Sequence, residues 1–321
     1  MKNLRTLGAL LLAGSWGLAG PEQAGGGGDG PTYTLEEIAR LIDAFHNSYN
    51  DKKQPEEDAT SILQDLQNAC KYIDSKGDQA TKDELKLKKQ VVAEVARGLK
   101  ARNRPVVTGA CAKALGLIGD KSTSRDLAGW LENVVLDAKN PHPQWLEWGF
   151  VSLALIGEED ANTLKLFISY AQGRHPDDSV PSIVITAIPQ WRRLNPKNRK
   201  ELFEKVYMYV SGLYGNSKKA GADGRAAKEQ YDRVKDSGLA TLSALAGVSS
   251  PFAEPEKVHE WWDENKKGRW EEYVGLQFRE KKKEEPKKKE EGEKEGEDAG
   301  TGKEKESEGG TPSAEGGPQE G

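Results

Sequence analysis

Four histidines and two cysteines are the side chains of this sequence best suited to acid–base or nucleophilic chemistry. The histidines, His46, His142, His175 and His259, lie in four different segments. None belongs to an HExxH motif or to a Cys/His spacing that would bind zinc. The sequence also lacks the phosphate-binding GxxxxGK[ST] loop and the GxSxG nucleophile motif. These residue types and spacings predict no catalytic site, no metal and no cofactor.

The two cysteines, Cys70 and Cys111, each lie on a stripe of apolar residues at helical spacing. A buried thiol behaves as a small apolar side chain. A disulfide requires the two Cα atoms to approach within about 7 Å, and an oxidising compartment would permit it. We expect two unpaired buried thiols, and the sequence leaves the bridged form open.

Three consecutive residues, Trp191, Arg192 and Arg193, are the candidate partner-binding group. An arginine pair beside an aromatic ring suits an acidic partner, although the solvated end of a helix is the simpler interpretation. Nucleic acid is a poor candidate, because Lys+Arg 47 against Asp+Glu 52 gives a formal net charge of −5 and no basic face is evident.

Tryptophans are unusually dense near the end of the apolar part of the chain, at Trp261, Trp262 and Trp270. Paired tryptophans can stack on a sugar or a peptide. A terminal helical repeat also needs an aromatic lid over its open apolar face. We favour the lid and keep the carbohydrate-binding surface as an alternative.

Helical spacing of apolar residues dominates residues 34–278 and predicts an all-α protein. The first helix opens on a capping box formed by Thr34 and Glu37. The expected helices cover residues 34–45, 56–76, 81–102, 105–119, 125–139, 143–157, 161–172, 178–194, 200–214, 225–246 and 256–267.

Two features within this series predict departures from regular helix. Pro189 removes a backbone donor inside the β-branched segment 178–194, so we expect a kinked helix there. Residues 215–224 predict a long projecting loop between the ninth and tenth helices.

Two of the expected helices end alike, ALGLIGD at residues 114–120 and SLALIGE at residues 152–158. Gly119 and Gly157 are suited to the left-handed conformation that ends a helix, and the acidic residue caps the next helix. The spacing of 157 − 119 = 38 residues is near the period of two-helix solenoid repeats. At these motifs the sequence resembles HEAT-like repeats. The resemblance implies a right-handed α-α superhelix of about five helix pairs plus a C-terminal capping helix, and a non-repeating bundle is the alternative.

The two ends of the chain differ from this body in composition. Residues 1–19 join a basic start to an uncharged apolar run and predict a signal peptide, followed by a glycine-rich linker at 20–33. Residues 279–321 hold 10 basic and 14 acidic residues and no large apolar residue, which predicts a disordered charged tail. No run of apolar residues is long enough for an ordinary membrane-spanning helix.

Taken together, these features predict an exported protein of the periplasm, cell envelope or extracellular space that is not an integral membrane protein. We expect a non-catalytic scaffold or adaptor whose helical-repeat surface binds another protein or an envelope polymer. An enzyme with its site built on a helical scaffold and a tryptophan-based carbohydrate-binding protein are the alternatives.

Overall fold

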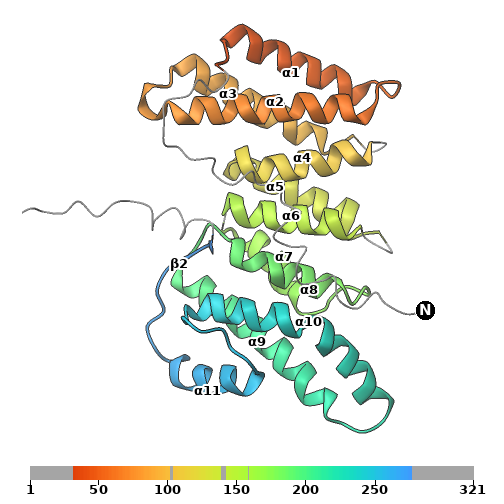
Figure 1. Cartoon of the computed structure of the whole chain (residues 1–321), viewed down its shortest axis with the longest axis vertical. Helices are drawn as coiled ribbons and strands as arrows, with labels where there is room; N and C mark the ends of the chain where they lie inside the picture. Colours follow the sequence, from red (N-terminus) through yellow and green to blue (C-terminus); the bar gives the residue numbers. More distant parts are fainter. Residues whose placement is uncertain (1–31, 102–103, 139–141, 158, 277–321) are drawn as a thin grey trace, which may run out of the picture. The chain divides into compact units, whose positions relative to one another are not determined.

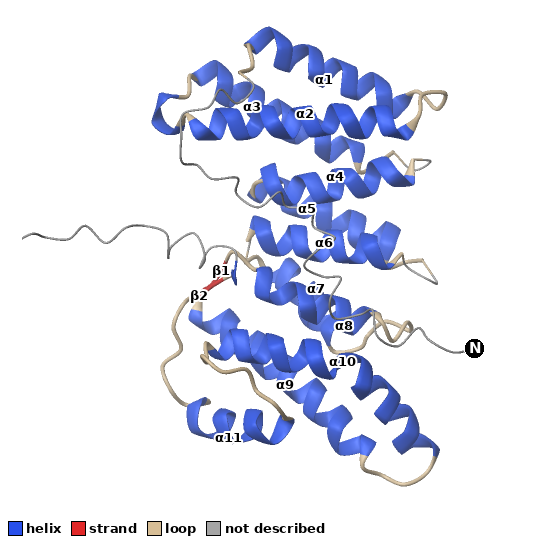
Figure 2. Ribbon diagram, viewed as in Figure 1, coloured by secondary structure: helices blue, strands red, loops and turns tan. Residues whose placement is uncertain are grey.

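The computed structural model describes residues 32–101, 104–138, 142–157 and 159–276. The expected signal peptide 1–19, residues 20–31 of the linker and the charged tail 279–321 lie outside these residues. Within the described ranges the regular secondary structure is helical apart from two strands of two residues each, as Figure 2 shows. The prediction of an all-α protein is confirmed at this level.

The helices follow one another along the chain in the order that Figure 1 labels. They are α1 (Leu35–Asn50), α2 (Glu56–Ser75), α3 (Lys82–Gly98), α4 (Pro105–Ile118), α5 (Lys121–Trp130), α6 (Pro143–Ile156), α7 (Ala161–Ala171), α8 (Val180–Ala187), α9 (Pro196–Ser217), α10 (Ala222–Ala246) and α11 (Pro255–Asn265). Short helical turns are η1 (Gly77–Gln79), the π-helical η2 (Leu131–Val135) and η3 (Ile188–Gln190). The strands are β1 (Arg193–Leu194) and β2 (Tyr273–Val274).

Residues 32–276 arrange these helices in two layers. In one layer α2 packs on α4, α4 on α6, α6 on α8 and α8 on α10. In the other layer α1, α3, α5, α7 and α9 contact one another in the same succession. Each odd-numbered helix also packs on the even-numbered helix that follows it (Figure 1). Each layer is therefore built from every second helix of the chain.

Helix starts follow local rules that the sequence carries. Thr34 caps α1 and Thr81 caps α3, each in a reciprocal capping box with the glutamate three residues later. Proline occupies the first helical position of α4 and α6, where its missing N–H costs no hydrogen bond. The boundaries expected for these helices are close to those observed.

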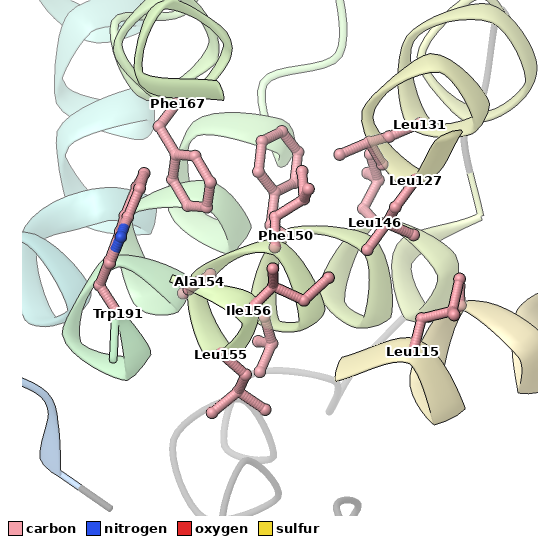
Figure 3. Close-up of a cluster of buried hydrophobic side chains, with 14 of the residues drawn as sticks. Leu115, Leu127, Leu131, Leu146, Phe150, Ala154, Leu155, Ile156, Phe167 and Trp191 are labelled. Atoms are coloured by element: carbon pink, nitrogen blue, oxygen red, sulfur yellow. The ribbon is translucent and has the colours of Figure 1, made fainter. Parts of the chain in front are cut away.

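The core runs between the two layers, and Figure 3 shows its central part. Phe150 of α6 meets Phe167 of α7 edge-on, with ring centroids 5.1 Å apart. The Trp191 ring packs on the other side of Phe167, and the two ring centroids are 4.6 Å apart. Burial of such large rings contributes much of the favourable free energy of folding.

The expected fifth helix, residues 125–139, divides into α5 and the π-helical η2. It starts earlier because the Asp120 side chain accepts the Ser122 amide at 2.8 Å and caps the first turn. At the C-terminal end of η2, the Leu136 amide donates to the Leu131 carbonyl oxygen, five residues earlier, at 2.8 Å. This wider turn ends the regular helix at Trp130.

The expected eighth helix, residues 178–194, is shorter than predicted. Regular helix ends at Ala187, because Pro189 has no N–H to donate to a helical backbone hydrogen bond. Pro189 itself lies in η3. Arg193 and Leu194 then form β1, which pairs antiparallel with β2. A helix end, a short turn and a strand therefore replace the single kinked helix that was expected over residues 178–194.

Two other expectations are wrong in detail. The loop at residues 215–224 is only 218–221, because α9 and α10 extend into both of its ends. Gly157 has the expected left-handed conformation, with φ of 72°, but Gly119 is extended, with φ of −70°. A Cβ atom at Gly119 would lie 2.3 Å from the Leu115 carbonyl oxygen, so close packing explains the glycine there.

Candidate functional site

A cleft of about 1340 Å³ is lined by α5, η2 and α7 on the layer of odd-numbered helices. Two adjacent helix starts lie at one end of it, because Asp120 precedes α5 and Asp160 precedes α7. The π-helical residue Glu132 lines the cleft as well. The helix starts thus place Asp120 and Asp160, and Glu132 is contributed by η2.

The floor of the cleft carries hydroxyl groups. Ser124 and Thr163 are both buried, and their hydroxyl oxygens lie 3.3 Å apart. Thr163 also donates to the Asp160 carboxylate at 2.6 Å. These bonds join α5 to α7 through a short polar chain across the floor.

Asp160 remains a carboxylate in this setting. Burial alone would raise the pKa of its carboxyl, but hydrogen bonds from the Thr163 side chain and from the Asn162 and Thr163 amides outweigh it and lower the pKa. The two amides donate at 2.8 and 3.1 Å. The Asp160 carboxylate thus caps the N-terminus of α7.

Exposed cations form the rim of the cleft, with Arg125 on α5, Lys165 on α7 and Arg174 beyond the end of α7. Asp126 and Glu132 add two carboxylates from the α5 side. No histidine or cysteine is among the described residues that line the cleft. Such a surface provides hydrogen bonds and charges of both signs for a polar chain.

The structure separates the three residues of the predicted binding group. Trp191 is fully buried against Phe167, so it belongs to the core. Arg192 and Arg193 have exposed side chains. The Arg192 amide donates to the Ala154 carbonyl at 2.8 Å, and its carbonyl accepts the Gly275 amide at 3.2 Å. The arginines therefore lie where the end of α6 meets the two-stranded sheet.

The C-terminal tryptophans pack around one phenylalanine. Trp261, Trp262 and Trp270 have ring centroids 5.0, 5.3 and 5.4 Å from that of Phe203 on α9. Trp261 meets Trp270 at 90°. Trp262 stacks on Phe203, with an interplanar angle of 19°. The three rings thus form one packed cluster over α9, an arrangement that suits a lid.

Sequence reasoning missed a polar cluster between α1 and α3. The buried Glu94 carboxylate accepts from the Tyr49 hydroxyl and contacts His46 Nδ1, both at 2.6 Å, and Arg97 donates to it at 2.6 Å. Burial raises the pKa of Glu94, but these three partners outweigh burial and lower it. The sequence shows that His46 and Tyr49 share one face of a helix. It does not show their partner, because Glu94 lies 45 or more residues further along the chain.

The remaining candidates are structural. His175 is buried, where its Nδ1 accepts the Asp177 amide and its Nε2 contacts the Leu136 carbonyl oxygen. Cys70 and Cys111 are buried free thiols, as predicted. Among the described residues, no three His, Cys, Asp or Glu side chains converge as metal ligands. None of the helices within the described ranges has the length and hydropathy needed to cross a membrane.

Comparison of the chain with protein-family models, with curated proteins and with solved structures found no match.

Proposed function

We propose that this chain is an exported, non-catalytic HEAT-like scaffold that binds an extended segment of a macromolecular partner in the α5–α7 cleft. The observation that carries the proposal is the cleft itself, with cations and carboxylates on its rim and hydroxyls on its floor. An extended chain offers both backbone polar groups and side-chain charges to such a surface.

The packing of helices supports the repeat architecture in this proposal. Every second helix contacts the next in each layer, as stacked two-helix repeats require. The close approach of α4 and α6 fits as well, since a Cβ atom at Gly116 would lie 2.5 Å from the Ser152 hydroxyl oxygen. On this basis we infer five pairs from α1–α2 to α9–α10, a right-handed superhelix and α11 as the capping helix.

The amino-terminal composition supports export. Residues 1–19 have the basic start, apolar run and small residues of a signal peptide. If the proposal holds, the mature protein begins near Gly20, and amino-terminal sequencing of envelope material that still shows Met1 would contradict it.

The binding surface is tested by charge reversal in the full chain. We expect the double variant Arg125→Glu/Lys165→Glu to lose partner capture from the envelope fraction while its thermal midpoint stays within a few degrees, because both side chains are exposed. The matched control is Lys86→Glu/Lys89→Glu, the same charge change at exposed positions of α3.

Three outcomes separate the alternatives. Equal loss of capture in the control variant would show that only net charge matters and would overturn the cleft as the site. Loss of capture in Arg192→Glu/Arg193→Glu alone would move the site to the junction of α6 and β1. Capture that depends on Trp261 or Trp262, with unchanged melting, would favour the carbohydrate-binding alternative.

A further inference from the structure

The tryptophan cluster over α9 borders a second hollow, at the start of α11. Phe252, in the loop between α10 and α11, lies near Trp261, with ring centroids 6.1 Å apart and ring planes at 62°. Both residues are half-buried, so part of each remains accessible. They line a hollow of about 380 Å³ together with Pro251, Ala253, Lys257, Glu260 and Glu264. We call this hollow the Phe252–Trp261 pocket.

The body of the protein holds both rings in place. The Phe252 amide donates to the buried Ser243 hydroxyl of α10 at 2.8 Å, which fastens the loop to that helix. The Trp261 ring centroid lies 5.0 Å from that of Phe203, and its plane is at 90° to that of Trp270. Rings that are already fixed by packing lose little freedom when a ligand binds, which favours binding.

The side of the pocket formed by α11 carries an excess of negative charge. Lys257, Trp261 and Glu264 are spaced by four and three residues, so they share one face of α11. Lys257 pairs with Glu260 at 2.8 Å, and these two charges offset each other. Glu264 is exposed and forms no salt bridge with another described residue. The pocket therefore combines two aromatic rings with one carboxylate that is available to a ligand.

We propose that the Phe252–Trp261 pocket binds an arginine side chain of a partner protein. An aromatic ring attracts a cation that lies over its face within about 6 Å of the ring centroid. Because the two centroids are 6.1 Å apart, one cation fits within this distance of both rings. The guanidinium group is planar and weakly hydrated, so it stacks on aromatic rings, and its N–H groups can donate to the Glu264 carboxylate.

Other ligand classes suit the pocket less well. The two carboxylates, Glu260 and Glu264, outnumber the one cation, Lys257, so the rim repels a carboxylate or a phosphate. An uncharged apolar side chain would fill the space between the rings but would leave the charge of Glu264 unused. A cation uses both features of the pocket.

This inference goes beyond the proposed function and does not depend on it. The pocket shares no lining residue with the α5–α7 cleft, and it lies on α11 and the loop before it. In this inference α11 has two roles, because one side of it covers α9 and another side presents a binding pocket.

An NMR titration of the isotope-labelled full chain tests the proposal, with the Phe252 amide and the Trp261 indole N–H as reporters. The probes are Nα-acetyl-arginine amide and Nα-acetyl-citrulline amide, which have closely similar shapes but differ in charge. We expect the arginine probe to shift both reporters. We also expect it to bind at least about fivefold more tightly than the citrulline probe.

Two variants locate the binding. Glu264→Lys should weaken binding of the arginine probe about fivefold or more and leave the fold intact, because the residue is exposed. The matched control is Glu229→Lys, the same charge change at an exposed position of α10 that does not line the pocket. Phe252→Leu keeps an apolar side chain but removes the ring, and it should weaken binding about two- to fivefold.

Four results would overturn the proposal. Absence of any reporter shift with the arginine probe would show that the pocket does not bind it. Equal affinity for the arginine and citrulline probes would show that charge is not recognised. Equal weakening by Glu229→Lys would show that only net charge matters. Shifts of the same reporters by N-acetylglucosamine, and not by the arginine probe, would assign the pocket to a carbohydrate. If Phe252→Leu disturbs the fold, Glu264→Lys and its control still decide the question.

Discussion

The Tyr273 hydroxyl donates to the Pro189 carbonyl oxygen at 2.7 Å, across a separation of 84 residues. Tyr273 is fully buried although it lies only three residues before the last described residue, Leu276. The chain that follows α11 therefore returns past the last helix pair and is fastened beside η3 and β1.

The first prediction concerns that bond. Tyr273→Phe keeps the ring but leaves the buried Pro189 carbonyl without its donor, so we expect a loss of about 1 kcal/mol in the free energy of unfolding. Tyr273→Ala, which also removes the ring, should cost about 3–5 kcal/mol. Urea unfolding measures both, and a phenylalanine variant as stable as the unmodified chain would show that the hydroxyl bond contributes nothing.

The second prediction compares two glycines. Gly157 has φ of 72°, and a Cβ atom there would lie 2.8 Å from Arg192 Cβ, so Gly157→Ala should cost about 1–2 kcal/mol. Gly212, inside α9, has open space around it. Gly212→Ala should therefore raise stability by about 0.5–1 kcal/mol. Thermal melting of the two variants should give shifts of opposite sign.

The third prediction concerns the tryptophan cluster. Removing a ring packed on Phe203 leaves a cavity, so Trp261→Ala and Trp262→Ala should each cost about 3 kcal/mol, the lower end for such changes because both rings are half-buried. Hydrogen exchange should rise in α9 and α11 before the rest of the chain. Met208→Ala, at a residue 55% exposed on α9, is the control and should change little.

The fourth prediction is a pH dependence. The pKa of Glu94 is lower in the folded than in the unfolded chain, so its contribution to stability is present above the ordinary value of about 4.3 and is lost as pH falls through the folded value. Glu94→Gln should destabilise the protein at pH 7 and flatten the decline of stability below about pH 4.3. Urea unfolding from pH 7 to pH 3 checks this, with exposed Glu36→Gln as control.

The fifth prediction concerns the thiols. Burial raises the pKa of the Cys70 thiol to about 12 and raises that of Cys111 as well, so little thiolate is present at pH 8. A thiol reagent should react with neither in the native protein and with both after denaturation. Denatured, unreduced protein with no reactive thiol would show that the two cysteines are bridged.

Local signals in the sequence predicted the helices well. The capping box at Thr34 and the first-turn prolines at residues 105 and 143 act within one turn, so they are readable without knowledge of the fold. Gly119 shows the limit of this reasoning. Its motif matches that of Gly157, but its backbone is extended and its small size is needed for close packing.

The candidate site was harder to predict, because its residues meet only through packing. Ser124 and Thr163 are 39 residues apart and come together only when α5 packs on α7. Strands β1 and β2 have two residues each, too few for an alternating pattern. Trp191 was named with Arg192 and Arg193 as a candidate partner-binding group, but it is buried while they are exposed, because neighbours in sequence do not fix burial.

The pairing of β1 with β2 also determines how the molecule bears a mechanical load. A force applied to the chain beyond Leu276 reaches the short ladder and the Tyr273 anchor before it reaches α11 or the last helix pair. Pulling from this end should detach β2 first, at a force that two residue pairs can resist. The last described residues are thus held to the helical body through a short ladder beside Arg193.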